Sequence, residues 1–247
     1  MLRVCDLSLR YPGGKLALTD FSLEVQPGEL VVVLGGNGSG KSTLLRCITR
    51  TLKPSAGEVW LDGINLCALE GEKLRQARLG LAMVWQQVSL VRRTSVLANV
   101  ASGALGRYST LRTVFAGLPA DELEAARDHL ADVGLAPLAA QRAGTLSGGQ
   151  AQRVAIARAL AQRPRVLLAD EPVASLDPEA SEEIMRLLQK LAHSEQLGVL
   201  CVLHQIELAY AYADRVIGIR NGQIAFNLPR SELSRDAVRQ LYLSEAA

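Results

Sequence analysis

Short apolar runs rich in Val, Ile and Leu recur along the chain and are separated by segments with a helical pattern. Each run is about as long as a strand and contains few polar residues, which is typical of strands buried on both faces of a parallel sheet. The runs cover residues 30–34, 81–85, 166–169, 199–203 and 215–219. This alternation predicts an α/β fold with a mainly parallel sheet.

The N-terminal third has a different pattern. Apolar positions alternate at Val4, Leu7 and Leu9, and apolar residues return at Leu18 and through 21–25. Turn-forming Pro and Gly residues stand beside these runs, at 12–14 and 27–28. Strands of this kind joined by short turns pair antiparallel, so we expect an antiparallel β subdomain that flanks the parallel core.

From about residue 87 to 155 the strand pattern gives way to helical segments at 95–105 and 120–133, broken at 117–119 and 134–137. This stretch is predicted to be an α-helical lobe inserted in the core. After the last strand, Asn221 and Gly222 form a hairpin turn into a strand at 223–226. A closing helix at 231–243, with Ser231 as its N-cap, is expected within a C-terminal segment at 228–247. Residues 1–247 are interpreted as one domain.

Composition narrows the class of partner. The chain has 27 Lys and Arg against 25 Asp and Glu, a net charge of +2, so it lacks the strong basic field that nucleic-acid binding uses. We therefore expect no nucleic-acid partner. No apolar run approaches the roughly 20 residues that cross a bilayer, and Arg3, Asp6 and Arg10 interrupt any signal peptide. Cytoplasmic residence is the expectation.

Four scattered cysteines argue against a zinc cluster or a disulfide framework: Cys5, Cys47, Cys67 and Cys201.

A glycine-rich loop follows the run at 30–34 and precedes a predicted helix at 43–50. Strand, loop and helix in this order are the context of a P-loop, in which backbone N–H groups and a helix N-terminus surround phosphate oxygens. Lys41 would reach the terminal phosphates, and Ser42 would bind Mg²⁺ through its hydroxyl. The nucleotide-binding residues predicted here are Gly35, Gly36, Asn37, Gly38, Ser39, Gly40, Lys41, Ser42 and Thr43. A chance Gly-rich turn is the alternative.

Two adjacent carboxylates, Asp170 and Glu171, end the apolar run at 166–169. Successive strand side chains point to opposite faces, so the two can have different roles. We expect Asp170 to bind Mg²⁺ and Glu171 to polarise the attacking water as a general base. On its own, such a pair would more often cap a helix or lie in a solvated turn.

A further motif consists of Ser147, Gly148, Gly149 and Gln150 before an Arg- and Ala-rich helix. It resembles the signature motif of ABC ATPases, and with the P-loop it implies a P-loop NTPase core that binds ATP. In that family two domains pair head to tail, and the signature of one closes over the ATP held by the other. The resemblance thus implies a dimer of two copies. An ordinary N-cap at Ser147 is the alternative.

Other positions match the same family in order. Tyr11 matches the aromatic residue that stacks on adenine, and Gln86 matches the loop glutamine that touches Mg²⁺ and the attacking water. Asp177 matches the loop that meets the dimer mate, and His204 matches the switch histidine at the γ-phosphate. Without the resemblance, Tyr11 would be a packing residue, Asp177 an N-cap before Pro178, and His204 a strand-end hydrogen-bonding residue. The implied catalytic set is Glu171, His204, Gln86 and Lys41, and the implied Mg²⁺ ligands are Ser42, Gln86 and Asp170.

The subfamily is indicated by segments at 89–91, 95–100, 106–109 and 171–178 and by the pair Val114 and Phe115, which look like the ATPase of phosphonate importers. That resemblance implies transmembrane permease partners, an indirect link to a solute-binding protein, and a peripheral place on the cytoplasmic side of the inner membrane. An importer motor for another solute and a component of a soluble phosphonate-degrading assembly are the alternatives. A DNA-repair or translation ATPase is disfavoured by the single nucleotide domain and the balanced charge.

Overall fold

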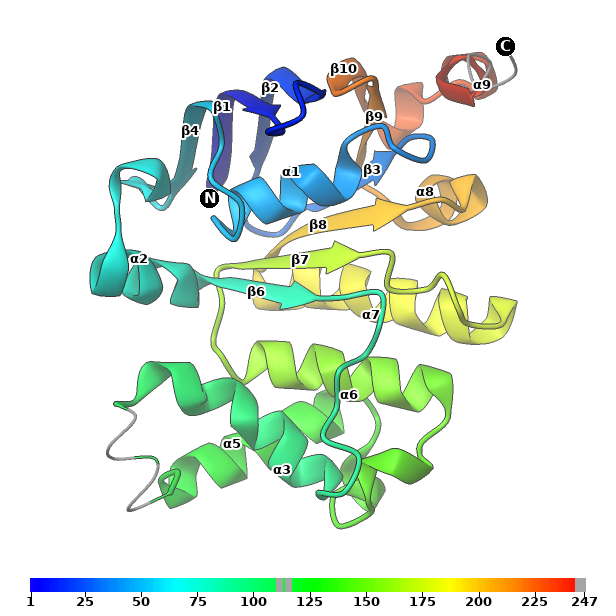
Figure 1. Ribbon diagram of the computed structural model, residues 1–247. Helices are drawn as coiled ribbons and strands as arrows, with labels where there is room; N and C mark the ends of the chain where they lie inside the picture. Colours follow the sequence, from blue (N-terminus) through cyan, green and yellow to red (C-terminus); the bar gives the residue numbers. More distant parts are fainter. Residues whose placement is uncertain (110–112, 114–116, 243–247) are drawn as a thin grey trace.

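A six-stranded sheet forms the centre of the computed structural model, which describes residues 1–109, 113 and 117–242 (Figure 1). Its strand order is β10-β9-β3-β8-β7-β6. All neighbours pair parallel except β9 and β10, which pair antiparallel. The strands are β3 (Leu30–Leu34), β6 (Leu81–Val84), β7 (Val166–Asp170), β8 (Gly198–Leu203), β9 (Arg215–Arg220) and β10 (Gln223–Pro229). The predicted α/β fold with a mainly parallel sheet is confirmed.

A second, antiparallel sheet packs beside it in the order β2-β1-β4-β5, as predicted for the N-terminal subdomain. Its strands are β1 (Leu2–Arg10), β2 (Leu16–Val25), β4 (Ala56–Leu61) and β5 (Ile64–Asn65). The sequence pattern did not predict β4 and β5. Only Val59 and Leu61 of β4 are fully buried, so the strand shows too few inward apolar positions to be recognised by its periodicity.

The central sheet separates two hydrophobic clusters. Val31 and Val33 of β3 face the antiparallel sheet and α1 (Lys41–Ile48), whereas Val32 and Leu34 face the opposite cluster. This is the alternation that a strand imposes on its side chains. Both faces of β3 are therefore covered, which explains why its sequence is apolar throughout.

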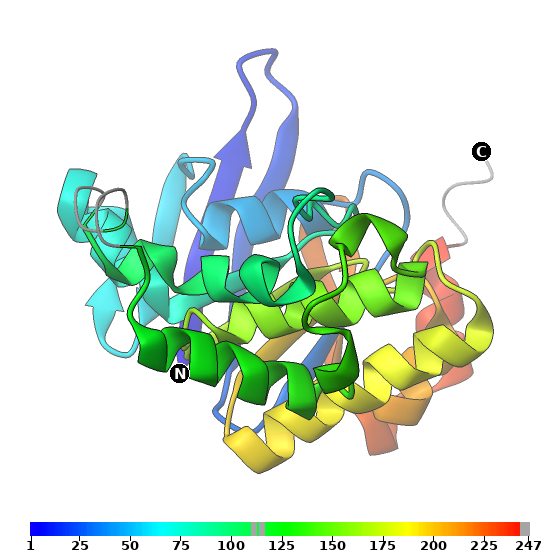
Figure 2. The same cartoon turned by 90° about the horizontal axis from the view of Figure 1, so that it is seen from below.

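Helices of the inserted lobe lie below the sheet in Figure 1, and Figure 2 shows them as a layer across that face. They are α3 (Val96–Ala101), a 3₁₀ helix (Ser102–Arg107), α5 (Ala120–Asp132) and α6 (Gly148–Leu160), with α7 (Pro178–Glu195) next to the sheet. The remaining helices are α2 (Gly71–Ala77), α8 (Ile206–Tyr212) and α9 (Arg235–Tyr242). Within the described part of the chain, none of the helices combines the length and apolar character that a bilayer crossing requires.

Two sequence-based boundaries need correction. The helix α1 begins at Lys41, before the predicted residue 43, because the Leu44 N–H already donates to the Gly40 carbonyl. The closing helix is not capped by Ser231, which lies in a 3₁₀ turn; α9 begins later, and Ser234 Oγ accepts from the Ala237 N–H. Val114, Phe115 and residues 243–247 lie outside the described residues.

Gly103 is a position where the lobe tolerates no side chain. A Cβ atom there would lie 1.9 Å from the Arg158 carbonyl oxygen on α6. We expect Gly103→Ala to force the 3₁₀ helix away from α6 and to lower the free energy of unfolding by about 3 kcal/mol, the upper part of the usual overpacking range. Differential scanning calorimetry would show a melting temperature lower by roughly 6–12 °C. Gly13→Ala is the control, since a Cβ there meets nothing within 4 Å, and equal melting temperatures for both variants would contradict the packing.

Candidate active site

The glycine-rich loop connects the C-terminal end of β3 to α1, and its geometry excludes side chains at particular points. A Cβ on Gly35 would lie 2.4 Å from the Ile219 carbonyl oxygen. Gly40 has a φ of 113°, in the region that favours glycine, and its Cβ would lie 2.7 Å from the Ala17 carbonyl oxygen. The backbone therefore follows a tight curve that ends on the N-terminus of α1, where N–H groups and the helix dipole favour an anion.

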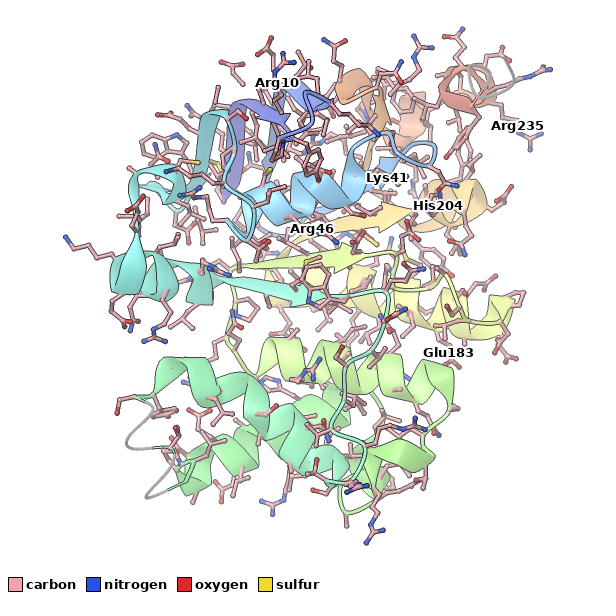
Figure 3. The ribbon with its side chains drawn as sticks, in the orientation of Figure 1. Arg10, Lys41, Arg46, Glu183, His204 and Arg235 are labelled. Atoms are coloured by element: carbon pink, nitrogen blue, oxygen red, sulfur yellow. The ribbon has the colours of Figure 1, made fainter. Side chains whose placement is uncertain are left out.

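Lys41 holds the loop from inside. Its side chain is buried, and its Nζ donates to the carbonyl oxygens of Gly35 and Gly36 at 2.7 and 2.8 Å. In Figure 3, Lys41 lies at the same end of the sheet as His204. Ser39 is also buried, and its Oγ has no hydrogen-bond partner among the described residues. The loop thus presents an ammonium group and a hydroxyl group whose chemistry suits phosphate oxygens.

A cavity of about 330 Å³ opens over this loop. Most of its lining residues are ones that the sequence predicted, and they come from the loop, from the β1–β2 hairpin and from the end of β7. They are Tyr11, Lys15, Ala17, Asn37, Gly38, Gly40, Lys41, Ser42, Thr43 and Glu171. A larger cavity of about 870 Å³ lies between α8 and α9, but its lining is mainly apolar and includes no residue of the phosphate loop.

Tyr11 forms one wall of the phosphate-loop cavity. It packs partly against the core, and its Oη lies 3.2 Å from Thr43 Oγ1 in α1. The Tyr11 N–H donates to the Lys15 carbonyl at 2.9 Å, which closes the main-chain turn next to the ring. The aromatic ring therefore lies beside the phosphate loop, where a flat ligand group could stack on it.

Ser42 and Asp170 bring two oxygen donors together at the base of the cavity. Ser42 Oγ donates to Asp170 Oδ1 at 3.2 Å, although the residues are far apart in sequence. Burial raises the pKa of the Asp170 carboxyl, and the Ser42 hydrogen bond opposes that rise. A buried carboxylate next to a hydroxyl is a pair that a hard divalent cation can bind.

Glu171 and His204 meet at the adjacent ends of β7 and β8. His204 Nε2 lies 2.5 Å from Glu171 Oε1, and the two side chains are only partly exposed. Glu171 has a φ of 50°, an uncommon value for a residue with a side chain, and its N–H donates to the Val202 carbonyl. Backbone strain of this kind is concentrated at functional sites, and here it directs a carboxylate towards the phosphate loop.

Comparison with known proteins places this chain in a family. The family model described as ABC transporter matches residues 18–174. The chain belongs to the ABC transporter family, and it is an ATPase. It is 46% identical over 245 residues to the phosphonates import ATP-binding protein PhnC of Wolinella succinogenes, covering 99% of this chain and 89% of that protein. It is 50% identical over 231 residues to the PhnC protein of Frankia casuarinae, covering 93% of this chain and 91% of that protein.

Solved structures of ABC cassettes share the fold. One is the ADP conformation of MJ1267, an ATP-binding cassette of an ABC transporter, with a TM-score of 0.86, 28% identity and coverage of 98% of both chains. Another is a dimeric post-hydrolysis state of the cassette MJ0796 bound to ADP and Pi, with a TM-score of 0.80 and 33% identity. It covers 93% of this chain and 99% of that chain.

Residues 147–150, which resemble the signature motif, lie at the N-terminus of α6 in this ABC ATPase and do not line the phosphate-loop cavity. Ser147 and Gln150 form a reciprocal capping box, with the Gln150 N–H donating to Ser147 Oγ at 3.2 Å and the Ser147 N–H donating to Gln150 Oε1 at 3.0 Å. The N-cap interpretation of Ser147 is therefore correct for the isolated chain.

The same surface includes the start of α7. A Cβ on Gly148 would lie 3.2 Å from Leu176, and a Cβ on Gly149 would lie 3.2 Å from Ala180. Asp177 caps α7, since its Oδ1 accepts from the Ala180 N–H at 2.8 Å. The signature and the loop at 175–177 thus form one continuous surface, separate from the phosphate loop of the same chain.

Gln86 follows the end of β6 and is exposed. It is not among the residues that line the cavity, so the structure does not bring it together with Ser42 and Asp170. Its neighbour Trp85 is 38% exposed and lines a different groove, with Met83 and Leu79. Gln86 itself lines neither the cavity nor that groove.

Sequence reasoning missed two features of the site. Lys15 and Ala17 line the cavity because the β1–β2 hairpin folds over the loop. The Gly222 N–H donates to the Ser39 carbonyl at 2.8 Å, and the Thr19 N–H donates to the Gly222 carbonyl, so the β9–β10 turn supports the phosphate loop. The turn residues were recognised as a hairpin signal, but no local pattern indicates a contact between segments so far apart.

The capping box makes a prediction about stability. Ser147→Ala removes the hydroxyl that accepts from the Gln150 N–H, and we expect the free energy of unfolding to fall by about 1 kcal/mol. Urea denaturation followed by circular dichroism measures this loss. Ser147→Asp keeps a capping oxygen and is the matched control; an alanine variant as stable as the wild type would contradict the capping role.

Proposed function

We propose that this ABC ATPase powers the import of a phosphonate through separate permease subunits. The relatives at 41–50% identity over nearly the whole chain are named phosphonate import ATP-binding proteins, which supports the solute class. The contact between Glu171 and His204 beside the phosphate-loop cavity carries the hydrolytic part of the proposal, because it holds a carboxylate where attacking water must be activated.

The nucleotide would lie across the cavity with its phosphates on the loop and Lys41, and its adenine on Tyr11. Ser42 and Asp170 fit Mg²⁺, because they supply a hydroxyl and a buried carboxylate within hydrogen-bond distance of each other. When bound, Mg²⁺ neutralises charge on the β- and γ-phosphates. Gln86 would join these ligands only after the loop that follows β6 moves towards the cavity.

Glu171 would accept the proton of the attacking water, and His204 would keep that carboxylate oriented and lie close to the γ-phosphate. This arrangement separates the roles of the two adjacent acids. Asp170 is buried against Ser42, whereas Glu171 lines the cavity. A carboxylate that is close to the metal but not bound to it can act as a base.

Two copies would form the working unit. The signature surface of one chain carries an N-terminal helix end and two glycines but lies apart from its own phosphate loop. A head-to-tail dimer would place that surface over the nucleotide of the partner, which gives it a phosphate to bind. The dimeric MJ0796 cassette supports this assembly.

The permease would dock in a groove of about 520 Å³ between α2, the end of β6 and the lobe. Its lining includes the exposed Trp85 and the partly buried Met83, with Arg75 and Arg78 at its side. An amphipathic permease helix with acidic residues is the occupant that these side chains suit. Peripheral association on the cytoplasmic side of the inner membrane would follow, with a solute-binding protein acting on the permease from the other side.

Purification of the tagged chain from its host in mild detergent tests the assembly. A hydrophobic permease that copurifies with the chain is the expected result. A complex that forms without membrane proteins would favour the phosphonate-degrading assembly instead. A Trp85→Glu variant tests the groove, because it places a charge there. The permease should no longer copurify with this variant, which should still bind ATP.

A further inference from the structure

Glu122 is a buried carboxylate that the nucleotide chemistry does not use. It lies in the first turn of α5, and its side chain is 3% exposed. A charge in such a place is unfavourable unless it is paired and hydrogen-bonded. Its partners therefore show what the protein gains from keeping it there.

Three side chains from two segments surround this carboxylate. Arg107 Nη2 forms an ion pair with Glu122 Oε2, and Tyr108 Oη donates to Glu122 Oε1 at 2.6 Å. Arg163, just beyond the C-terminal end of α6, lies 3.5 Å from Oε1 through its Nη2. Burial alone would raise the pKa of Glu122, but the Tyr108 hydrogen bond and the two guanidinium groups outweigh it and lower the pKa. Glu122 is thus ionised at neutral pH, and it links the turn at 106–108 to α5 and to the end of α6.

A second contact holds the same turn on the side that faces the groove. The Gly106 carbonyl accepts a hydrogen bond from Arg75 Nη1 of α2 at 2.7 Å. Gly106 itself lines the groove, and a Cβ there would lie 3.0 Å from Cδ2 of Leu79, which also lines it. Residues 106–108 therefore join the groove wall to the helical lobe.

We propose that Glu122 is a positioning residue that fixes the turn at 106–108 as a wall of the permease groove and links that wall to α5 and α6. The inference rests on the proposed function, in which a permease helix occupies the groove. Movement of that helix would press on the turn, and the Glu122 network would pass the displacement to α6. Because α6 carries the signature residues at its N-terminus, the permease would control when the signature reaches the partner's nucleotide.

The test measures ATPase activity of each variant alone and of the same variant reconstituted with its permease and phosphonate-loaded solute receptor. For Glu122→Gln we expect basal kcat and KM for ATP within about 2-fold of the wild type, because the network lies outside the phosphate-loop cavity. Stimulation by the permease and receptor should fall at least 5-fold. Arg107→Lys keeps a cation beside Glu122 and should retain most of the stimulation.

Two milder variants guard against misfolding of Glu122→Gln. Tyr108→Phe removes only the hydroxyl donor, and Arg163→Gln removes a 59% exposed guanidinium that pairs with Glu122 from the end of α6. Both should lower stimulation about 2-fold or more with unchanged basal activity. Glu183→Gln breaks the Arg153–Glu183 ion pair between α6 and α7 and is the matched control that should leave stimulation intact.

Full stimulation in Tyr108→Phe and Arg163→Gln would overturn the inference. So would an equal fall of basal and stimulated activity, because that pattern indicates a purely structural role. A wild-type chain that the permease and receptor do not stimulate would overturn the proposed function itself, and the inference with it.

Discussion

Replacement of Glu171 by Gln is expected to lower kcat for ATP hydrolysis by at least about 100-fold while ATP still binds. A positioned general base contributes roughly 10²–10⁴-fold, and an amide cannot accept the proton of water. Glutamine has nearly the same size and shape as glutamate, so the contact with His204 and the lining of the cavity should persist. Single-turnover hydrolysis and equilibrium binding of a fluorescent ATP analogue measure the two effects separately.

The matched control for this substitution is Glu179→Gln, which changes an exposed carboxylate in the first turn of α7. It should hydrolyse ATP at the wild-type rate. Wild-type hydrolysis by Glu171→Gln would show that another group activates the water, and Asp170 would then need a different role from the one proposed here.

Replacement of Lys41 by Met should weaken ATP binding roughly 100-fold. A hydrogen bond to a charged group contributes about 1.5–3 kcal/mol, and the upper end of that range corresponds to such a change in Kd. Lys41 is buried among loop carbonyls that hold its ammonium group in place, so no solvent-exposed cation can substitute for it. Isothermal titration calorimetry with ATP gives the Kd directly.

Lys15→Met provides the comparison, because Lys15 lines the same cavity from the hairpin but is exposed. We expect its Kd to change by less than about 5-fold, since an exposed charge is screened by solvent. Equal losses of ATP affinity in the two variants would contradict the proposed role of Lys41 in binding ATP. The melting temperature of Lys41→Met must also be measured, because the Gly35 and Gly36 carbonyls lose a donor.

The phosphate loop was predictable because its chemistry is contained in consecutive residues between a strand and a helix. Gly35 and Lys41 are six positions apart, and α1 begins at Lys41, so their contact is a local one. The parallel sheet was predictable for a similar reason, since β3 and β8 are apolar on both faces.

Contacts between distant segments were not predictable from the residues themselves. Glu171 and His204 meet only because β7 and β8 are neighbours in the sheet, and the sequence order does not give that adjacency. The family resemblance supplied the role of His204 at the γ-phosphate but not its contact with Glu171. Lys15 at the cavity and the Gly222 support of the phosphate loop had no signal of either kind.

The closing helix shows a different limit of local patterns. Ser231 was predicted as the N-cap, but Ser234, three residues later, accepts the capping hydrogen bond from the Ala237 N–H. Ser231 lies in a 3₁₀ turn, Leu233 after it is buried, and the helix begins at Arg235. A capping residue type at one position therefore does not by itself fix where a helix begins.

The central claim is that ATP hydrolysis by this chain drives phosphonate import, and uptake into proteoliposomes tests it most directly. Vesicles would contain the chain with its permease, with the solute receptor and radiolabelled methylphosphonate on one side and MgATP on the other. The account predicts uptake that requires ATP and disappears in Glu171→Gln. Hydrolysis without any accumulation of phosphonate, under conditions where the permease is bound, would contradict it.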